Sequence, residues 1–417
     1  MSEALKQENH YERAQTVALE DINLIDDNLW INEDFWPYFE RLRRDDPVHY
    51  CANEDGRERQ GPYWSITRYN DIMAIDTDHK RFSSEPAITI MDPEDDFTLP
   101  MFIAMDQPKH DIQRKTVSPI VAPMNLQNME ALIRERTQRV LDSLPIDEEF
   151  DWVDRVSIEL TTLMLATLFD FPYEERRKLT RWSDVATASL DAGIIESEEE
   201  RRAELYECLE YFTKLWNERV NEEPKTDLIS MLAHGEATRN MDPLEYLGNL
   251  ILLIVGGNDT TRNSMTGGVY ALNKFPDQFQ KLRENPSLIP NMVSEIIRWQ
   301  TPLAYMRRTA LEDVEMHGKT IKKGDKVIMW YASGNRDDTV IENPNKLIID
   351  RENARRHISF GFGIHRCVGN RLAELQLTIL WEEILKRFSD IEVVAEPPRI
   401  LSSFVKGYSS MMVKVKK

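Results

Sequence analysis

A single cysteine enclosed by glycines is the feature that most constrains the fold of this chain. The segment runs His357-Ile-Ser-Phe-Gly-Phe-Gly-Ile-His-Arg-Cys367-Val-Gly-Asn-Arg, with glycines at 361, 363 and 369. A helical pattern begins directly after it, so we expect the sulfur at a helix N-terminus. Backbone N–H groups there, such as those of Val368 and Gly369, would stabilise a thiolate. The alternative for a lone cysteine is a small buried hydrophobic residue.

The composition indicates a globular protein and excludes several classes of function. Of 417 residues, 41% are hydrophobic and 30% charged, and 52 basic against 72 acidic residues give a net charge of −20. Such a chain lacks the basic footprint of a nucleic-acid binder. Three cysteines make neither a disulfide framework nor a zinc-ligand spacing. No apolar run is long enough for a signal peptide or a membrane span, so we expect a cytoplasmic protein.

Hydrophobic periodicity predicts a mainly α protein with minor β. Helical spacing is found over residues 126–143, 152–169, 203–221, 288–300 and 371–387. Short β-like segments occur at 48–51, 63–67, 326–331 and 411–415. Strands and helices do not alternate as in a doubly wound sheet. We expect a polar, partly loose N-terminal segment over residues 1–40 and a single domain over residues 41–417.

One predicted helix is unusually long. Asp242 can cap it, Pro243 fits its first turn, and apolar periodicity continues to Pro276. This gives roughly 32 residues and a length of about 48 Å. Its middle holds Gly256 and Gly257, followed by Asn-Asp-Thr-Thr, which are poor helix formers. A kink or the close approach of a ligand would explain these residues.

The cysteine segment resembles the haem-binding loop of the cytochrome P-450 family at every fixed position of Phe-Gly-x-Gly-x-His-x-Cys-x-Gly. Three more motifs follow that family's order: Glu295-Ile-Ile-Arg298, the mid-helix segment 256–261, and His110-x-x-x-Arg114. The resemblance covers the whole chain. It implies the family's triangular helical prism with small β-sheets and a long central helix over the haem. It also implies haem b with Cys367 as the thiolate ligand, whose electron donation favours cleavage of the O–O bond.

The resemblance assigns roles to the matching residues. Asp259 and Thr260 resemble the family's acid–alcohol pair, in which Thr260 holds dioxygen and a water and Asp259 connects that water to bulk solvent. Alternatively, Thr260 bonds only to its own helix and Asp259 lies at the surface. A buried ion network behind the haem would join Glu295, Arg298 and Arg351. Haem-binding residues, the first four as cationic partners of the propionates, would be His110, Arg114, Arg308, His365, Phe360, Gly361, Gly257 and Gly369.

Longer segments are similar to one branch of the family, the bacterial alkane and fatty-acid terminal (omega-) hydroxylases. They include GPYWSITRYNDIMAI, LPMFIAMDQPKHDIQRKTVSPIVAP and RWQTPLAYMRRTAL. That branch is soluble and coupled to a ferredoxin. The resemblance implies insertion of one oxygen atom from O₂ into the terminal methyl group of medium-chain alkanes or fatty acids, giving primary alcohols. Electrons would come from NADH through a ferredoxin reductase and a ferredoxin.

The segments expected to overlie the haem are mostly apolar, with no Arg or Lys placed as an obvious anchor for a carboxylate. Such a pocket suits a hydrocarbon, since each buried methylene contributes about 0.8 kcal/mol. A methyl C–H bond is stronger than an internal one, so terminal attack requires a narrow channel, for which Leu303 and Met306 are candidates. Each residue could equally be ordinary core. The expected pocket residues are Ile88, Ile90, Met101, Phe102, Leu252, Val255, Gly256, Leu303, Met306 and Phe404.

Basic side chains gather near the cysteine although the chain as a whole is acidic. No flavin or nicotinamide domain is recognisable, so we expect electrons from a separate protein. The expected docking residues for an acidic ferredoxin are Arg355, Arg356, Arg366, Lys109 and Lys115. Two alternatives remain: a hydroxylase of another apolar substrate, such as a terpene or a steroid, and a haem-binding sensor without turnover. The intact acid–alcohol pair argues against the sensor.

Overall fold

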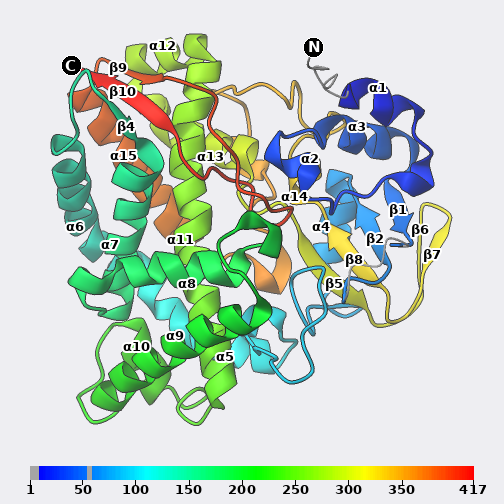
Figure 1. The fold of residues 1–417 in the computed structure, drawn as a ribbon, viewed down its shortest axis with the longest axis horizontal. Coiled ribbons are helices and arrows are strands. Elements are labelled where there is room, and N and C mark those ends of the chain that lie inside the picture. The colour runs from blue at the N-terminus through cyan, green and yellow to red at the C-terminus, as the bar shows by residue number, and fades with distance from the viewer. Residues whose placement is uncertain (1–8, 54–58) are drawn as a thin grey trace.

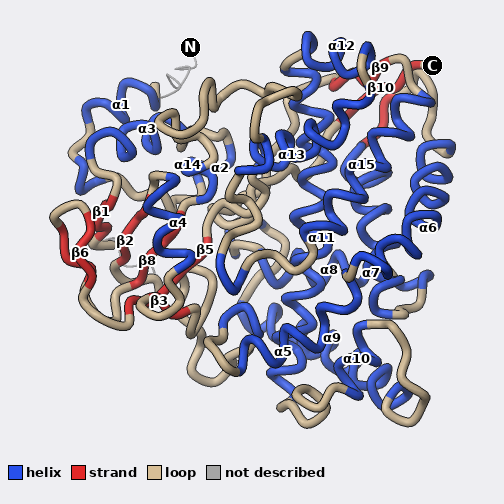
Figure 2. Tube along the Cα trace, turned by 180° about the vertical axis from the view of Figure 1, so that it is seen from behind, coloured by secondary structure: helices blue, strands red, loops and turns tan. Residues whose placement is uncertain are grey.

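The computed structural model describes residues 9–53 and 59–417. Helices gather on one side of the molecule and the largest sheet on the other (Figures 1 and 2). The expectation of a mainly α protein with minor β is confirmed. Helices of the helical side are α6 (Pro123–Asp142), α7 (Glu159–Phe169), α8 (Arg177–Thr187), α9 (Glu198–Arg219), α10 (Leu228–His234), α11 (Pro243–Lys274), α12 (Pro276–Glu284), α13 (Ile289–Gln300) and α15 (Asn370–Arg387).

Helix α11 runs through the middle of the helical side and confirms the predicted length and cap. Asp242 accepts a hydrogen bond from the N–H of Leu244 at 2.9 Å, and the helix continues for 32 residues to Lys274. It is unbroken at the two glycines. A Cβ on Gly257 would lie 2.6 Å from Leu165 of α7, whereas one on Gly256 would meet nothing within 4 Å. Close approach of a neighbouring helix explains Gly257, whereas no contact within the described chain requires glycine at 256.

Three small sheets complete the fold. The five-stranded sheet has the order β1 (Val48–Cys51), β2 (Tyr63–Ile66), β8 (Lys326–Met329), β5 (Met306–Ala310) and β3 (Phe82–Ser83). All its pairings are antiparallel except β2 with β8. The second sheet joins β4 (Glu149–Asp151), β10 (Met412–Lys416) and β9 (Asp390–Val393), and the third pairs β6 (Val314–Met316) with β7 (Lys319–Ile321).

Strand β5 was not predicted from the sequence, because two of its residues are arginines. Arg307 and Arg308 are both buried, which their sequence does not suggest. Ion pairs with Asp92 at 2.9 Å and Asp76 at 2.7 Å make their burial tolerable. The strand therefore carries charge where a period of two would require apolar residues.

The N-terminal region differs from the expected loose polar segment. From residue 9 onward it forms α1 (His10–Thr16), α2 (Asn28–Ile31) and α3 (Trp36–Asp45). Its scattered apolar side chains are buried, and the ring of Trp30 stacks on that of Trp330 with centroids 5.6 Å apart. The apolar residues are spread over short helices and loops and form no long periodic run, so the sequence pattern did not indicate this packing. Residues 1–8 lie outside the described part of the chain.

Three further helices border the site. They are α4 (Tyr69–Thr77), α5 (Lys109–Val117) and α14 (Tyr331–Gly334). None of the helices described by the structure combines the length and apolar character that crossing a membrane would require.

Candidate functional site

A cavity of about 930 Å³ lies between the middle of α11 and the cysteine segment. Cys367 borders it from one side and Thr260 from α11. All ten residues that the sequence analysis expected in a substrate pocket line this cavity: Ile88, Ile90, Met101, Phe102, Leu252, Val255, Gly256, Leu303, Met306 and Phe404. Segments far apart in the chain thus meet around one mostly apolar space.

The cysteine segment is a tight loop that ends at the first turn of α15. The N–H of Cys367 donates to the carbonyl of Phe360 at 2.8 Å, which closes the loop. The sulfur is open to the cavity and otherwise enclosed by protein. This burial raises the pKa of the Cys367 thiol, while hydrogen bonds from the N–H groups of Gly369 and Asn370 lower it. Of the backbone donors expected at this helix start, Gly369 is one of the two, and Asn370 is the other.

Asp76 of α4 holds the loop from the sheet side. One carboxylate oxygen accepts from Arg308 at 2.7 Å, and the other accepts from the N–H of Phe362 at 2.7 Å and the hydroxyl of Tyr331 at 2.9 Å. Gly361 and Gly363 have φ of +63° and +68°, and a Cβ on Gly363 would lie 2.7 Å from the Asp76 carbonyl. Glycine is required there by both backbone and contact. Nothing in the sequence singled out Asp76.

Four basic side chains form a cluster at one end of the cavity. Arg114, Arg308 and His365 line it, and the ring of His110 lies 4.1 Å from that of His365, centroid to centroid. Nε2 of His110 and both ring nitrogens of His365 are buried without a hydrogen-bond partner in the described chain. Burial and the charge of Arg308 lower the pKa of His365 to about 2. Arg308 already pairs with Asp76 and His110 with Asp111, each at 2.7 Å, so the unsatisfied groups are the three ring nitrogens, and the two carboxylates of a haem fit them.

On α11, the alcohol of Thr260 and the acid of Asp259 have different surroundings. The Thr260 hydroxyl donates to the carbonyl of Gly256 at 2.9 Å, as the helix-bonded alternative expected. Asp259 is buried, not at the surface. It accepts from Asn258 and from Arg262, each at 2.9 Å.

Arg262 extends this contact toward the surface. Its guanidinium also donates to Asp184 of α8 at 3.1 Å, and the Asp184 side chain is 30% exposed. Burial raises the pKa of Asp184, and the charge of Arg262 opposes that shift. The sequence analysis identified neither residue, although the spacing of Arg262 from Asp259, one helical turn, was a usable signal. The three side chains form a polar path from α11 to solvent.

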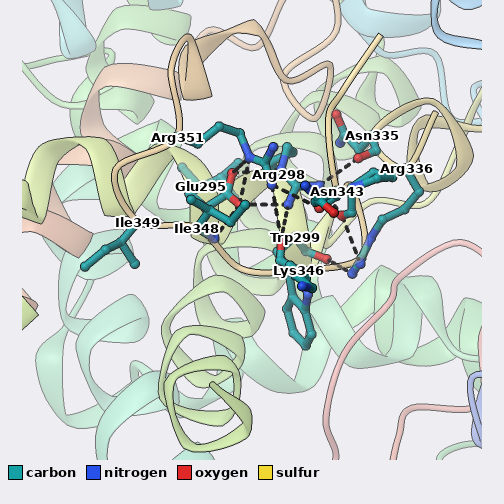
Figure 3. A network of polar contacts seen from close by, with 12 residues as sticks. Glu295, Arg298, Trp299, Asn335, Arg336, Asn343, Lys346, Ile348, Ile349 and Arg351 are labelled. Carbon is teal, nitrogen blue, oxygen red and sulfur yellow. Dashed lines mark hydrogen bonds and ion pairs between the residues drawn. The ribbon is translucent and has the colours of Figure 1, made fainter. Parts of the chain in front are cut away.

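A buried ion network joins α13 to the segment before the cysteine loop (Figure 3). Glu295 accepts from Arg298 through two bonds of 2.8 Å and from Arg351 at 3.0 Å. Arg298 also donates to the carbonyls of Asn335, Pro344 and Lys346. Its five N–H donors therefore all have partners. The structure brings together the three residues that the sequence analysis grouped.

The expected docking residues lie near the cysteine, but they are not equally available. Arg355, Arg356, Arg366 and Lys115 are exposed, and none has an ion pair within the described residues. Lys109 is exposed as well, yet it pairs with Glu245 of α11 at 2.9 Å. Arg114 of α5 donates to the carbonyl of Arg366, so α5 lies against the cysteine loop. Four of the five basic groups are free to meet a partner.

Known proteins with similar sequences and structures belong to one family. The family model described as cytochrome P450, written P-450 here, matches residues 146–415. Linalool 8-monooxygenase of Pseudomonas putida is 33% identical over 90% of this chain and 94% of its own length. The methyl-branched lipid omega-hydroxylase of Mycobacterium bovis is 31% identical over 91% and 92%. The solved structure of cytochrome P-450-153 from Novosphingobium aromaticivorans is 48% identical, with a TM-score of 0.87, over 94% and 99%.

The ion network yields a prediction about stability. Replacing Glu295 by Gln removes the one carboxylate between two arginines, of which Arg298 is fully buried. We expect the free energy of unfolding to fall by about 3–5 kcal/mol, the usual cost of breaking a buried pair. Chemical denaturation followed by tryptophan fluorescence measures it. Glu284→Gln is the matched control, because that exposed carboxylate accepts from Gln280 and has no ion pair with any residue that the structure describes. Equal losses in both variants would contradict the assignment.

Proposed function

This chain belongs to the cytochrome P-450 family, and from that premise we propose that it inserts one oxygen atom from O₂ into the terminal methyl group of medium-chain alkanes or fatty acids. Proteins of the family are monooxygenases that bind haem b through a cysteine thiolate. The observation that carries the proposal is the apolar cavity joining the Cys367 sulfur to a wall of hydrocarbon side chains. The likeness to a methyl-branched lipid omega-hydroxylase supports the same reaction.

Within this proposal, the chain would hold the haem at its iron and at its propionates. Cys367 would ligate the iron, and the cluster of His110, Arg114, Arg308 and His365 would bind the propionates. When bound, the haem supplies an iron centre that binds and reduces O₂. Phe360, Gly361 and Gly369 of the loop and Gly257 of α11 line the same cavity and would contact the haem. The orphaned histidine nitrogens support this assignment, since buried ring nitrogens without partners are uncommon.

Substrate binding depends on contacts with carbon. A linear chain gains about 0.8 kcal/mol for each methylene that leaves water. Selectivity for the terminal methyl group then requires that internal CH₂ groups be kept away from the iron. Leu303 is held by a backbone bridge to Val405, and Met306 begins β5, paired with Met329 of β8. Their side chains are therefore carried by fixed backbone, which supports a rigid, narrow channel.

Proton delivery falls to α11. Cleavage of the O–O bond consumes two protons, which must reach a largely apolar space. We place Thr260 at the cavity end of that path, because its hydroxyl oxygen can still accept a hydrogen bond from the cavity. Asp259 and Asp184 would carry protons onward to solvent, and Arg262, which keeps its own protons, would hold the two carboxylates together through its hydrogen bonds.

A second candidate is the hydroxylation of a terpene. The similarity to linalool 8-monooxygenase favours it, since linalool is a terpene alcohol. Turnover with NADH, ferredoxin reductase and ferredoxin separates the two when octane, dodecanoic acid and limonene are supplied in turn. We expect octan-1-ol or 12-hydroxydodecanoic acid as products. Oxidation of limonene alone would overturn the proposal in favour of the terpene hydroxylase.

The proton path predicts the behaviour of a Thr260→Ala enzyme. NADH and O₂ should still be consumed, but hydrogen peroxide should rise and alcohol product should fall, because O₂ is reduced without controlled protonation. The ratio of alcohol to NADH measures this coupling. Thr260→Ser keeps the hydroxyl and should restore most of the coupling. If Thr260→Ala couples as well as the unmodified enzyme, Thr260 has no part in proton delivery.

The steric account of selectivity predicts the products of Leu303→Ala. Loss of the isobutyl group widens the channel, so the secondary alcohols of octane should increase severalfold relative to octan-1-ol, as measured by gas chromatography. Leu190→Ala is the matched control, because Leu190 lines the open end of the same cavity and is 44% exposed. A product ratio that is unchanged in Leu303→Ala and in Met306→Ala would place the restriction elsewhere.

Electron transfer is proposed to occur at the basic side chains around the cysteine loop. A complementary ferredoxin would be acidic, and charge complementarity mainly raises the association rate. At limiting ferredoxin, turnover should therefore fall as salt rises, and Arg355→Glu or Arg356→Glu should slow reduction without changing substrate binding. Lys214→Glu is the control for a charge reversal away from the cysteine loop. Lys214 lies on α9, which packs on α8 and α10 and carries none of the expected docking residues. Reduction rates insensitive to salt and to both reversals would show that docking lies elsewhere.

A further inference from the structure

The cavity reaches the surface between residues 86–99 and the connection from α8 to α9. Leu190 and Asp191 of that connection line the cavity and are exposed. Pro86 lines it from the other side and is exposed as well. In Figure 1 the start of α9, in green, lies beside the light-blue segment of residues 86–99. A linear substrate whose methyl group faces the haem would have its other end at this opening.

Arg202 of α9 bridges the opening. Its Nε donates to Glu94 at 2.9 Å, Nη1 donates to Asp96 at 2.9 Å and Nη2 donates to Asp96 at 2.7 Å. Both carboxylates belong to the segment on the other side of the opening. The guanidinium lies over the ring of Phe97 at 5.2 Å. The hydrogen bonds from Arg202 lower the pKa of Asp96, so this carboxylate is charged.

The two other arginines at this end are also paired. Arg59 lies 3.3 Å from Glu94 and donates to the carbonyl of Asp92. Arg201 lies 2.8 Å from Glu198 and donates to the carbonyl of Ala188. The sequence analysis expected no basic anchor in the pocket. Within the described chain, arginines do line its open end, but each already has a carboxylate partner.

We define the paired mouth as the three arginines and their three carboxylate partners: Arg59, Arg201 and Arg202 with Glu94, Asp96 and Glu198. We infer that this paired mouth selects neutral hydrocarbons over free carboxylates. The inference rests on the proposed function and narrows it to alkanes. A fatty-acid carboxylate at the mouth would compete with Glu94 and Asp96 for the same guanidinium. Each carboxylate that it displaced would remain beside it as a like charge. Exposed Asp191 adds a further negative charge. An alkane has no charged end and incurs neither cost.

Spectral titration of the haem-loaded enzyme with decane, methyl decanoate and decanoate at neutral pH tests this inference. The measured quantity is the ratio of the decanoate dissociation constant to that of the methyl ester, which removes the shared contribution of the chain. In the unmodified enzyme the ester should bind more tightly. In Glu94→Gln/Asp96→Asn the ratio should fall about tenfold, because two arginines become available for a charge-assisted hydrogen bond.

Asp95→Asn is the matched control. It removes one negative charge, half of what the double variant removes, from the residue between Glu94 and Asp96, and Asp95 has no ion pair among the residues the structure describes. Decane should bind equally to all variants, which checks that the channel is intact. If the double variant loses decane binding, Asp96→Asn compared with Asp95→Asn provides the same comparison.

Two results would overturn the inference: equal affinity of the unmodified enzyme for decanoate and its ester, or a ratio that changes no more in Glu94→Gln/Asp96→Asn than in Asp95→Asn. Failure of the proposed function has a different signature. In that case neither decane nor methyl decanoate shifts the haem spectrum, while limonene does.

Discussion

The buried ion network of Glu295, Arg298 and Arg351 is the interaction on which the geometry of the site depends. Arg298 ties α13 to the carbonyl of Asn335. The side chain of Asn335 in turn bonds the N–H of Ile358 and the hydroxyl of Ser359, both at 2.8 Å, where the cysteine loop begins. Asp76 holds the same loop from the sheet side. Cys367 is thus positioned by charges that belong to α13 and α4, at a distance from the sulfur itself.

What the sequence predicts best is what local spacing determines. The cap and length of α11 follow from Asp242, Pro243 and an apolar period, and the tight loop indicated by glycines is confirmed by the positive φ of Gly361 and Gly363. Partners brought together by tertiary structure carry no such signal. The sequence does not distinguish Asp76 from other acidic helix residues, because only the fold brings it to Arg308. Strand β5 was not predicted, because the carboxylate partners of its arginines lie elsewhere in the chain.

Selectivity in this account has two separate sources at opposite ends of one cavity. Near the cysteine, fixed apolar side chains such as Leu303 would determine which carbon is oxidised, as proposed above. At the surface, the carboxylates that already pair with the arginines would determine which polar end group is accepted. The sequence could predict the first from apolar segments. It could not predict the second, because the sequence does not show whether an arginine has a carboxylate partner in the folded chain.

The central claim is that Cys367 supplies a thiolate to the iron of a haem held in this cavity. The ferrous carbon-monoxide complex of Cys367→Ser tests it most directly, because only a thiolate ligand gives the strongly red-shifted absorption band of this family. The account predicts that the unmodified protein shows the band, while Cys367→Ser still binds haem through its propionate cluster but lacks it. A variant that keeps the band would contradict the assignment of Cys367 and the site built around it.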